Sequence, residues 1–273
     1  MKKKAAIPEH DYLRTHKRFP SVWCPGCGIG TVLGAIIRAV QALNLSKDEV
    51  ALLSGIGCTG RMPVYVDFNT MHTTHGRALA FATGLKLARP DMEIIVVMGD
   101  GDALAIGGNH FIHAARRNVE LTAIVVNNRI YGMTGGQVSP TTPTGERGLT
   151  APFGQIEQAF DIARMAEAAG ASFVARSTTY HAMELDRLIA RGIEKRGFSV
   201  IEVLTQCPVS YGELNQAGDA VEMLKWFRDN TTPVGDRAAP GKIPRGVLVD
   251  RELPGYVETY QKLIASARKR ARA

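Results

Sequence analysis

Four cysteines give the first indication of chemistry in this sequence. Cys24 and Cys27 stand three residues apart in "WCPGCG", while Cys58 lies in "GIGCTGR" and Cys207 in "TQCP". The close pair suits a redox-active dithiol, half of a zinc site or half of an iron–sulfur site. A dithiol would leave Cys58 and Cys207 unexplained, although each of these alone also suits a small buried hydrophobic position. Four thiolates indicate zinc or a [4Fe–4S] cluster, and their spacing does not decide between the two.

A second motif, "MGDGDALAIGG", carries Asp100 directly after an apolar run. Such a turn leaves backbone N–H groups free at the start of a helix, where they attract phosphate, although an aspartate there can also simply cap the helix. The next apolar run ends in "NNRIYG", which places Asn128 at a second strand end. Ligands bind at this edge of open α/β sheets, and carboxylate, amide and phosphate oxygens suit Mg²⁺. Asp100 and Asn128 are therefore predicted to face one another across a magnesium site.

These motifs must be positioned by a sheet. Short apolar runs alternate with helical segments, which predicts an α/β fold with a mostly parallel sheet and helices on both faces. The predicted strands cover 50–57, 93–99, 121–127, 172–177 and 198–204. The predicted helices cover about 28–43, 76–89, 103–117, 155–169 and 180–196.

The pattern changes after Pro208, where Pro, Gly and charged residues dominate. Residues 1–208 are predicted to form one domain, and 209–273 an irregular extension that is not an independent domain. The extension is expected to contain a short helix at 221–228 and a basic helix from about Pro254. Segment 138–154 is too long and polar for an ordinary connection, which predicts a functional loop.

Composition narrows the class of protein. A chain of 273 residues with 45% hydrophobic content suits one large α/β domain. Its first residues lack the apolar run of a signal peptide, and no segment could span a bilayer, so a cytoplasmic protein without a membrane partner is expected. Much of the net charge of +7 lies in "KKK" at 2–4 and in "ARKRARA" at the C-terminal end. We interpret these ends as solvated tails, with attraction to an acidic partner as the alternative, and expect no nucleic-acid partner.

The Asp100 and Asn128 motifs together resemble the thiamin diphosphate signature, in which Gly-Asp-Gly is followed some 25 residues later by Asn-Asn; here 25 residues separate Gly101 from Asn127. The resemblance implies a thiamin diphosphate-binding fold. It also implies that Mg²⁺ is bound by Asp100, the side chain of Asn128 and the carbonyl of Ile130. The amides that would hold the diphosphate belong to Gly101, Asp102, Gly132 and Met133.

Over residues 22–208 the chain resembles the β subunit of a 2-oxoacid:ferredoxin oxidoreductase, and most of all the 2-oxoglutarate members. The stretches that carry the resemblance are "WCPGCG", "GIGCTGR", "HTTHGRALAFATGLKLA", "GDGDALAIGGNHFIHAARRN", "VVNNRIYGMTGGQVSPTTPTG" and "TQCP". The family implies one [4Fe–4S] cluster on Cys24, Cys27, Cys58 and Cys207, beside the thiamin diphosphate. Further cofactor contacts are then expected from Ile56, Gly57, Cys58, Thr59 and His75, where His75 could otherwise be a core histidine.

The implied activity is oxidative decarboxylation of a 2-oxoacid with coenzyme A, giving an acyl-CoA, CO₂ and reduced ferredoxin. The sequence offers no second ferredoxin-type cysteine motif and no identifiable glutamate to activate the cofactor. The expected partners are therefore a separate ferredoxin and an α subunit that supplies the glutamate, with the extension after Pro208 as a contact to that subunit.

The expected substrate is 2-oxoglutarate, because Arg61 of "GCTGR" could bind its distal carboxylate. Arg61 could equally pair with a neighbouring acid or with coenzyme A phosphates. Alternatives are the same chemistry on branched-chain 2-oxoacids or pyruvate, a non-catalytic electron-transfer or assembly subunit, and a zinc-stabilised interaction module.

Overall fold

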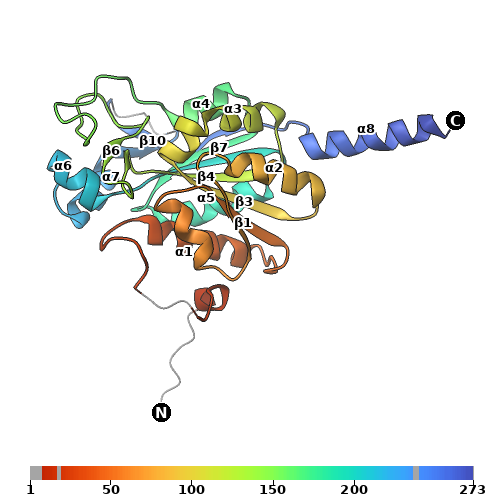
Figure 1. Cartoon of the computed structure of the whole chain (residues 1–273), viewed down its shortest axis with the longest axis horizontal. Helices are drawn as coiled ribbons and strands as arrows, with labels where there is room; N and C mark the ends of the chain where they lie inside the picture. Colours follow the sequence, from red (N-terminus) through yellow and green to blue (C-terminus); the bar gives the residue numbers. More distant parts are fainter. Residues whose placement is uncertain (1–7, 17–19, 236–239, 273) are drawn as a thin grey trace, which may run out of the picture.

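The structure, a computed structural model, describes residues 8–16, 20–235 and 240–272 (Figure 1). The basic stretch at 2–4 lies outside these residues. The strands of the main sheet are β1 (Val50–Ser54), β2 (Asn69–His72), β3 (Glu93–Gly99), β4 (Leu121–Asn127), β7 (Phe173–Thr178), β8 (Phe198–Leu204), β9 (Thr231–Pro233) and β10 (Ile243–Asp250). A separate hairpin pairs β5 (Ile130–Tyr131) with β6 (Gln137–Val138).

The helices follow the same alternation along the chain. The α-helices are α1 (Ile29–Ala42), α2 (Ala78–Ala88), α3 (Gly108–Arg117), α4 (Ile162–Ala168), α5 (Ala182–Glu194), α6 (Glu213–Asn215), α7 (Ala220–Asn230) and α8 (Tyr256–Ala271). Two 3₁₀ helices are η1 (Pro8–Tyr12) and η2 (Thr59–Val64), and two short π-helices are η3 (Asp102–Ile106) and η4 (Pro208–Gly212).

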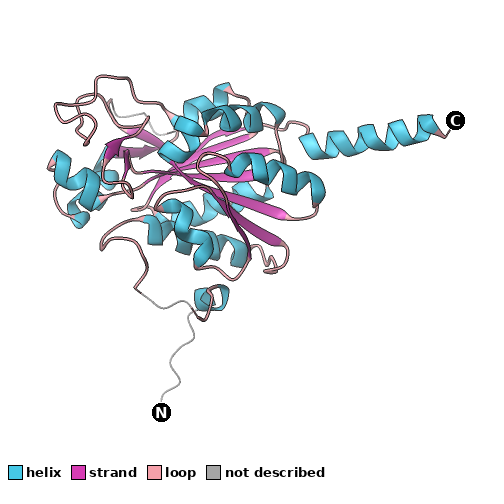
Figure 2. Cartoon of the chain, in the orientation of Figure 1, coloured by secondary structure: helices cyan, strands magenta, loops and turns pink. Residues whose placement is uncertain are grey.

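One eight-stranded sheet forms the centre of the fold, in the order β2-β1-β3-β4-β8-β7-β10-β9. The strands from β2 to β7 in this order are all parallel, and β10 joins β7 antiparallel. Helices α2, α3 and α4 cover one face, and α1 and α5 cover the other (Figure 2). Alternate side chains supply the two cores: Leu53 and Val96 face the first group of helices, Leu52 and Ile95 the second. The predicted mostly parallel sheet with helices on both faces is confirmed.

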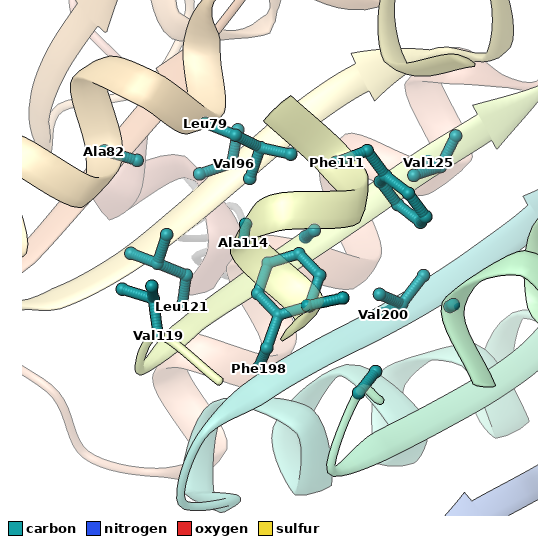
Figure 3. Close-up of a cluster of buried hydrophobic side chains, with 14 of the residues drawn as sticks. Leu79, Ala82, Val96, Phe111, Ala114, Val119, Leu121, Val125, Phe198 and Val200 are labelled. Carbon is teal, nitrogen blue, oxygen red and sulfur yellow. The ribbon is translucent and has the colours of Figure 1, made fainter. Parts of the chain in front are cut away.

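Side chains of α2 and α3 pack on β3, β4 and β8 in one buried cluster (Figure 3). Phe111 of α3 packs edge-to-face on Phe198 of β8, with ring centroids 6.1 Å apart. Leu79 of α2 is buried in the same cluster as Val96 of β3. The helices on both sides of the turn after Gly99 are therefore anchored in the core, and the turn is held between them.

The C-terminal extension is more regular than the sequence predicted, because it adds β9 and β10 to the main sheet. The predicted division after Pro208 thus falls between strands of one sheet. Pro244 and Gly246 obscured β10 in the sequence; an edge region tolerates both, and the register shifts between Val247 and Val249. Helix α8, as expected from its sequence, ends the chain and extends away from the sheet (Figure 1).

The helix predicted over 155–169 is shorter in the structure, where α4 begins at Ile162. Asp161 caps it, since its carboxylate accepts a hydrogen bond from the backbone N–H of Arg164 at 3.1 Å. Residues 155–161 belong instead to the long loop before α4.

Candidate functional site

The C-terminal ends of β1, β3 and β4 open into one pocket of about 270 Å³. Parallel strands end at a common edge, so the loops that follow them converge there. Every residue that the sequence predicted to contact the cofactor or Mg²⁺ lines this pocket, and Gly99, Tyr131 and Thr134 complete it. The predicted members are Ile56, Gly57, Cys58, Thr59, His75, Asp100, Gly101, Asp102, Asn128, Ile130, Gly132 and Met133.

Asp100 lies at the floor of the pocket and is 2% exposed. Its Oδ1 accepts the N–H of Gly101 at 2.9 Å, and its Oδ2 accepts the hydroxyls of Ser139 and Thr141. Burial raises the pKa of Asp100, and these hydrogen bonds oppose the rise. The sequence did not identify Ser139 or Thr141 as site residues, although both belong to the loop that was predicted to be functional.

The turn that carries Asn128 and Ile130 depends on Arg129, which adopts a left-handed backbone with φ of 64°. The Oδ1 of Asn128 accepts the N–H of Ile130 at 3.2 Å, and the hydroxyl of Thr142 donates to the carbonyl of Arg129 at 2.6 Å. The 139–142 segment thus supports both predicted magnesium-binding loops.

Tyr131 explains why residue 101 is glycine. A Cβ at position 101 would lie 2.2 Å from Cε1 of Tyr131, so any larger residue would collide with the ring. The Tyr131 hydroxyl also donates to the Gly101 carbonyl at 3.3 Å. Burial raises the pKa of Tyr131, and the nearby carboxylates of Asp100 and Asp102 raise it further. In the sequence, the only indication of this contact is that Tyr131 follows Asn128 by three residues.

Asp102 ties three loops of the pocket together through its side chain. Its Oδ1 accepts the N–H of Gly76 at 2.6 Å and that of Ile56 at 3.3 Å, and it lies 2.8 Å from Nδ1 of His75. Within the described chain, His75 Nδ1 and Asp102 Oδ2 are buried polar atoms without a hydrogen-bond partner. Burial raises the pKa of Asp102. The sequence assigned a role only to the amide of this residue.

The three cysteine-bearing segments meet beside the pocket. The indole N–H of Trp23 donates to the carbonyl of Cys58 at 2.8 Å, and the side-chain amide of Gln206 donates to the carbonyl of Gly26 at 3.0 Å. These bonds join the "WCPGCG" segment to both of the other cysteine-bearing segments.

The thiols themselves also lie near one another. A Cβ placed on Gly132 would be 3.5 Å from Sγ of Cys207 and 3.9 Å from Sγ of Cys58. Burial raises the pKa of Cys27 to about 12, and the other three thiols add to that rise. All four cysteines are free. Within the described residues, no group of three or more His, Cys, Asp or Glu side chains has an arrangement that could hold a metal ion.

Arg61 does not line the pocket. It lies in η2, three residues after Cys58, and is half-buried. Its side chain has no hydrogen bond or ion pair within the described residues, so the neighbouring acid that the sequence allowed as its partner is not found there.

A second cavity, here called the basal cavity, has a similar volume of about 260 Å³ but lies at the opposite edge of the sheet. It includes Glu93 and Leu121, the first residues of β3 and β4. None of the predicted site residues lines it.

No helix within the described chain has the length and apolarity that a membrane span requires.

Comparison with known proteins agrees with this geometry. Residues 26–203 match the family "thiamine pyrophosphate enzyme, C-terminal TPP binding domain". The 2-oxoglutarate synthase subunit KorB of Methanocaldococcus jannaschii is 48% identical, over 94% of this chain and 97% of the relative. The subunit of the same name from Archaeoglobus fulgidus is 49% identical, over 95% of each chain.

A solved structure is similar over most of its length. The 2-oxoglutarate:ferredoxin oxidoreductase of Magnetococcus marinus, determined with 2-oxoglutarate, coenzyme A and succinyl-CoA bound, superposes with a TM-score of 0.87 at 33% identity. The match covers 97% of this chain and 92% of the solved chain. The chain therefore belongs to the oxidoreductase family of 2-oxoglutarate:ferredoxin oxidoreductase β subunits, and its sheet is a thiamine pyrophosphate-binding domain.

Proposed function

We propose that this chain is the β subunit of an enzyme that oxidatively decarboxylates 2-oxoglutarate with coenzyme A, giving an acyl-CoA, CO₂ and reduced ferredoxin. One observation carries the proposal: Cys58 lines the pocket that contains Asp100 and Asn128, and its thiol also lies near Cys207. A decarboxylation site and an electron acceptor built from these residues would share a wall. Electrons would then travel only a short path out of the pocket.

Thiamin diphosphate and Mg²⁺ fit the residues of the pocket. Asp100, Asn128 and the carbonyl of Ile130 offer oxygen ligands, and the buried Asp100 carboxylate gains from a nearby cation. The backbone around Gly101, where no Cβ fits, can lie close to a diphosphate. When bound, the cofactor supplies the carbon nucleophile for decarboxylation of a 2-oxoacid. The chain contributes position: Asp102 holds the Ile56 and His75 loops, and Tyr131 covers the turn at Gly101.

A [4Fe–4S] cluster on Cys24, Cys27, Cys58 and Cys207 is part of the proposal. Its support is the hydrogen bonding that joins the three cysteine segments and the position of the Cys58 and Cys207 thiols beside Gly132. The cluster would accept electrons singly and pass them to ferredoxin. Because such thiolates need reducing surroundings, we place the protein in the cytoplasm.

An α subunit completes the proposed enzyme. The described residues around the pocket include Asp100 and Asp102, but no glutamate lines it. The residue that activates the cofactor would therefore come from the partner, and the isolated chain would be catalytically silent.

Arg61 is proposed to select the substrate. Its guanidinium lacks an ion pair within the described residues and stands on the helix that begins beside Cys58, so it is available for the distal carboxylate of a dicarboxylate. A relative from Saccharolobus solfataricus, 44% identical over 71% of this chain, is named only as a 2-oxoacid:ferredoxin oxidoreductase β subunit. Other 2-oxoacids are therefore the competing substrates, and branched-chain 2-oxoacids and pyruvate are the ones to compare with 2-oxoglutarate.

Anaerobic co-expression with the α subunit tests the function. The purified complex should contain thiamin diphosphate, and should reduce a low-potential acceptor only when both 2-oxoglutarate and coenzyme A are present. A complex that binds thiamin diphosphate but oxidises no 2-oxoacid would favour the non-catalytic electron-transfer subunit. Reduction that needs 2-oxoglutarate but not coenzyme A would refute transfer of the acyl group to coenzyme A. A native preference for branched-chain acids would overturn the substrate assignment.

A further inference from the structure

The loop of residues 145–160 exposes apolar side chains that the proposed chemistry does not use. Phe153 is 99% exposed and Ile156 is 90% exposed, and Leu149 and Phe160 are also exposed. Single exposed apolar residues are common, but a bulky aromatic and an aliphatic residue three positions apart with almost no protein contact are not. Such side chains are typical of a surface that is covered in a complex.

The backbone of this loop is nevertheless well ordered by its own hydrogen bonds. The N–H of Gly145 donates to the carbonyl of Gln155, and the N–H of Gln155 donates to the carbonyl of Glu146, both at 2.7 Å. Gly154 has φ of 109°, and a Cβ there would lie 2.9 Å from the carbonyl oxygen of Gly145. Glycine lets the two legs of the loop approach, so Phe153 and Ile156 are displayed by a preorganised backbone. Preorganisation reduces the entropy lost on binding.

The loop is attached at several points to the pocket that contains Asp100 and Asn128, here called the cofactor pocket. Its preceding residues Ser139 and Thr141 bind Asp100, and the N–H of Leu149 donates to the carbonyl of Gly136 at 2.7 Å. Gly136 in turn donates its N–H to the carbonyl of Tyr131, a residue of the pocket wall. In Figure 1 the loop, drawn in green, stands at the end of the molecule away from α8.

We propose that Phe153 and Ile156 are the anchor residues through which this chain binds the partner subunit that completes its cofactor pocket. The partner would offer an apolar socket for one aromatic and one aliphatic side chain. This inference rests on the two-subunit enzyme proposed above. The loop is bonded at its base to Asp100 and Gly136. A subunit that covers the loop would therefore lie against the segment that supports the pocket, where the missing glutamate is needed.

Co-purification tests the proposal without requiring turnover. The α subunit, carrying an affinity tag, is co-expressed with the full chain or with its Phe153→Ser/Ile156→Ser variant, and the affinity is measured by titration of the separated subunits. Exposed aromatic anchors typically behave as hot spots, so the double variant should bind at least ~30-fold more weakly. Met183→Ser is the control, since Met183 is an apolar residue that is 70% exposed at the start of α5. It should change the affinity less than about two-fold, as for an ordinary surface substitution.

The possible results distinguish the α subunit from a second copy of this chain as the partner of the loop. They also distinguish failure of the anchor proposal from failure of the proposed function. The thermal unfolding of the isolated double variant should match that of the wild type, because Phe153 and Ile156 bury little surface. Wild-type affinity of the double variant for the α subunit, or failure of the wild-type chain to bind that subunit, overturns the anchor. If the isolated wild-type chain self-associates, and the double variant does not self-associate but still binds the α subunit normally, then the loop binds a second copy of this chain. A complex that depends on both anchors yet oxidises no 2-oxoacid refutes the proposed function and leaves the anchor in place.

Discussion

The cofactor pocket and the basal cavity have nearly the same volume, about 270 and 260 Å³, but opposite chemistry. Several of the long charged side chains that line the basal cavity have partners. Lys86 Nζ donates to the carbonyl of Met92 at 2.7 Å, Arg196 pairs with Glu258, and Glu120 accepts two backbone N–H groups of α8. In the cofactor pocket, by contrast, His75 Nδ1 and Asp102 Oδ2 have no hydrogen-bond partner within the described chain, although His75 Nδ1 lies 2.8 Å from the other oxygen of Asp102.

The volume of a cavity therefore indicates ligand binding less well than whether its buried polar atoms have hydrogen-bond partners. Unmet hydrogen bonding is costly, so a protein retains it where a ligand or a partner can satisfy it. In the described structure, Asn127, Ser199 and Arg245 also have unpartnered buried atoms, but they line neither cavity. A buried polar atom without a hydrogen-bond partner therefore indicates a binding site only where it also lines a cavity.

The largest expected effect comes from replacing the carboxylate at the floor of the cofactor pocket. Asp100→Ala should weaken thiamin diphosphate binding by more than ~100-fold, because loss of the proposed Mg²⁺ ligand should exceed the roughly 10–100-fold cost of losing an outer partner. Calorimetric titration with the cofactor and Mg²⁺ measures this, and the iron content should be largely unchanged. Glu120→Ala in the basal cavity is the control and should bind the cofactor normally. Tight cofactor binding by the Asp100→Ala variant would mean that the pocket around Asp100 is not the thiamin diphosphate site.

Cys58 is the residue that joins the pocket to the thiols. Anaerobic protein should be brown with about four irons per chain, and each Cys→Ser change should damage the cluster. Cys58→Ser should also weaken cofactor binding, whereas Cys24→Ser should affect iron alone, because only Cys58 lines the pocket. Metal analysis and cofactor titration of the two variants give the comparison. Stoichiometric zinc without iron would refute the cluster.

Arg61→Met should lower kcat/KM for 2-oxoglutarate by about 30- to 1000-fold, equivalent to ~2–4 kcal/mol for a charge pair that loses one partner. The same change should have little effect on a monocarboxylic 2-oxoacid. Steady-state kinetics of the αβ complex with both substrates measure the difference. An equal fall on both would assign Arg61 to the cofactor or coenzyme A.

The smallest effect is expected in the basal cavity itself. Glu120 accepts the N–H groups of Val257 at 3.0 Å and Glu258 at 3.2 Å, and so caps the first turn of α8. Glu120→Ala should lower the free energy of unfolding by about 1 kcal/mol, the typical value of a lost helix cap. Urea unfolding measures this change, and kcat should stay at the wild-type value. A large loss of activity would mean that the basal cavity has a function of its own.

Much of the sheet and the site could be predicted because both depend on local patterns. Continuous apolar runs located five strands, and the Asp100 and Asn128 motifs follow two of them directly. The contacts of Asp100 with Ser139 and Thr141 could not be predicted, since they span about forty residues and involve hydroxyls in a loop without a periodic pattern. Tyr131 was missed for a similar reason, because its ring matters only through its contact with Gly101.

The late position of β10 in the chain has a consequence for biosynthesis. Its partner β7 is made some seventy residues earlier, so during translation the edge of β7 stays open for on the order of seconds. An unpaired edge of this kind can recruit strands from other nascent chains. A chaperone or a partner subunit would protect the sheet most effectively if it acted before residues 243–250 emerge from the ribosome.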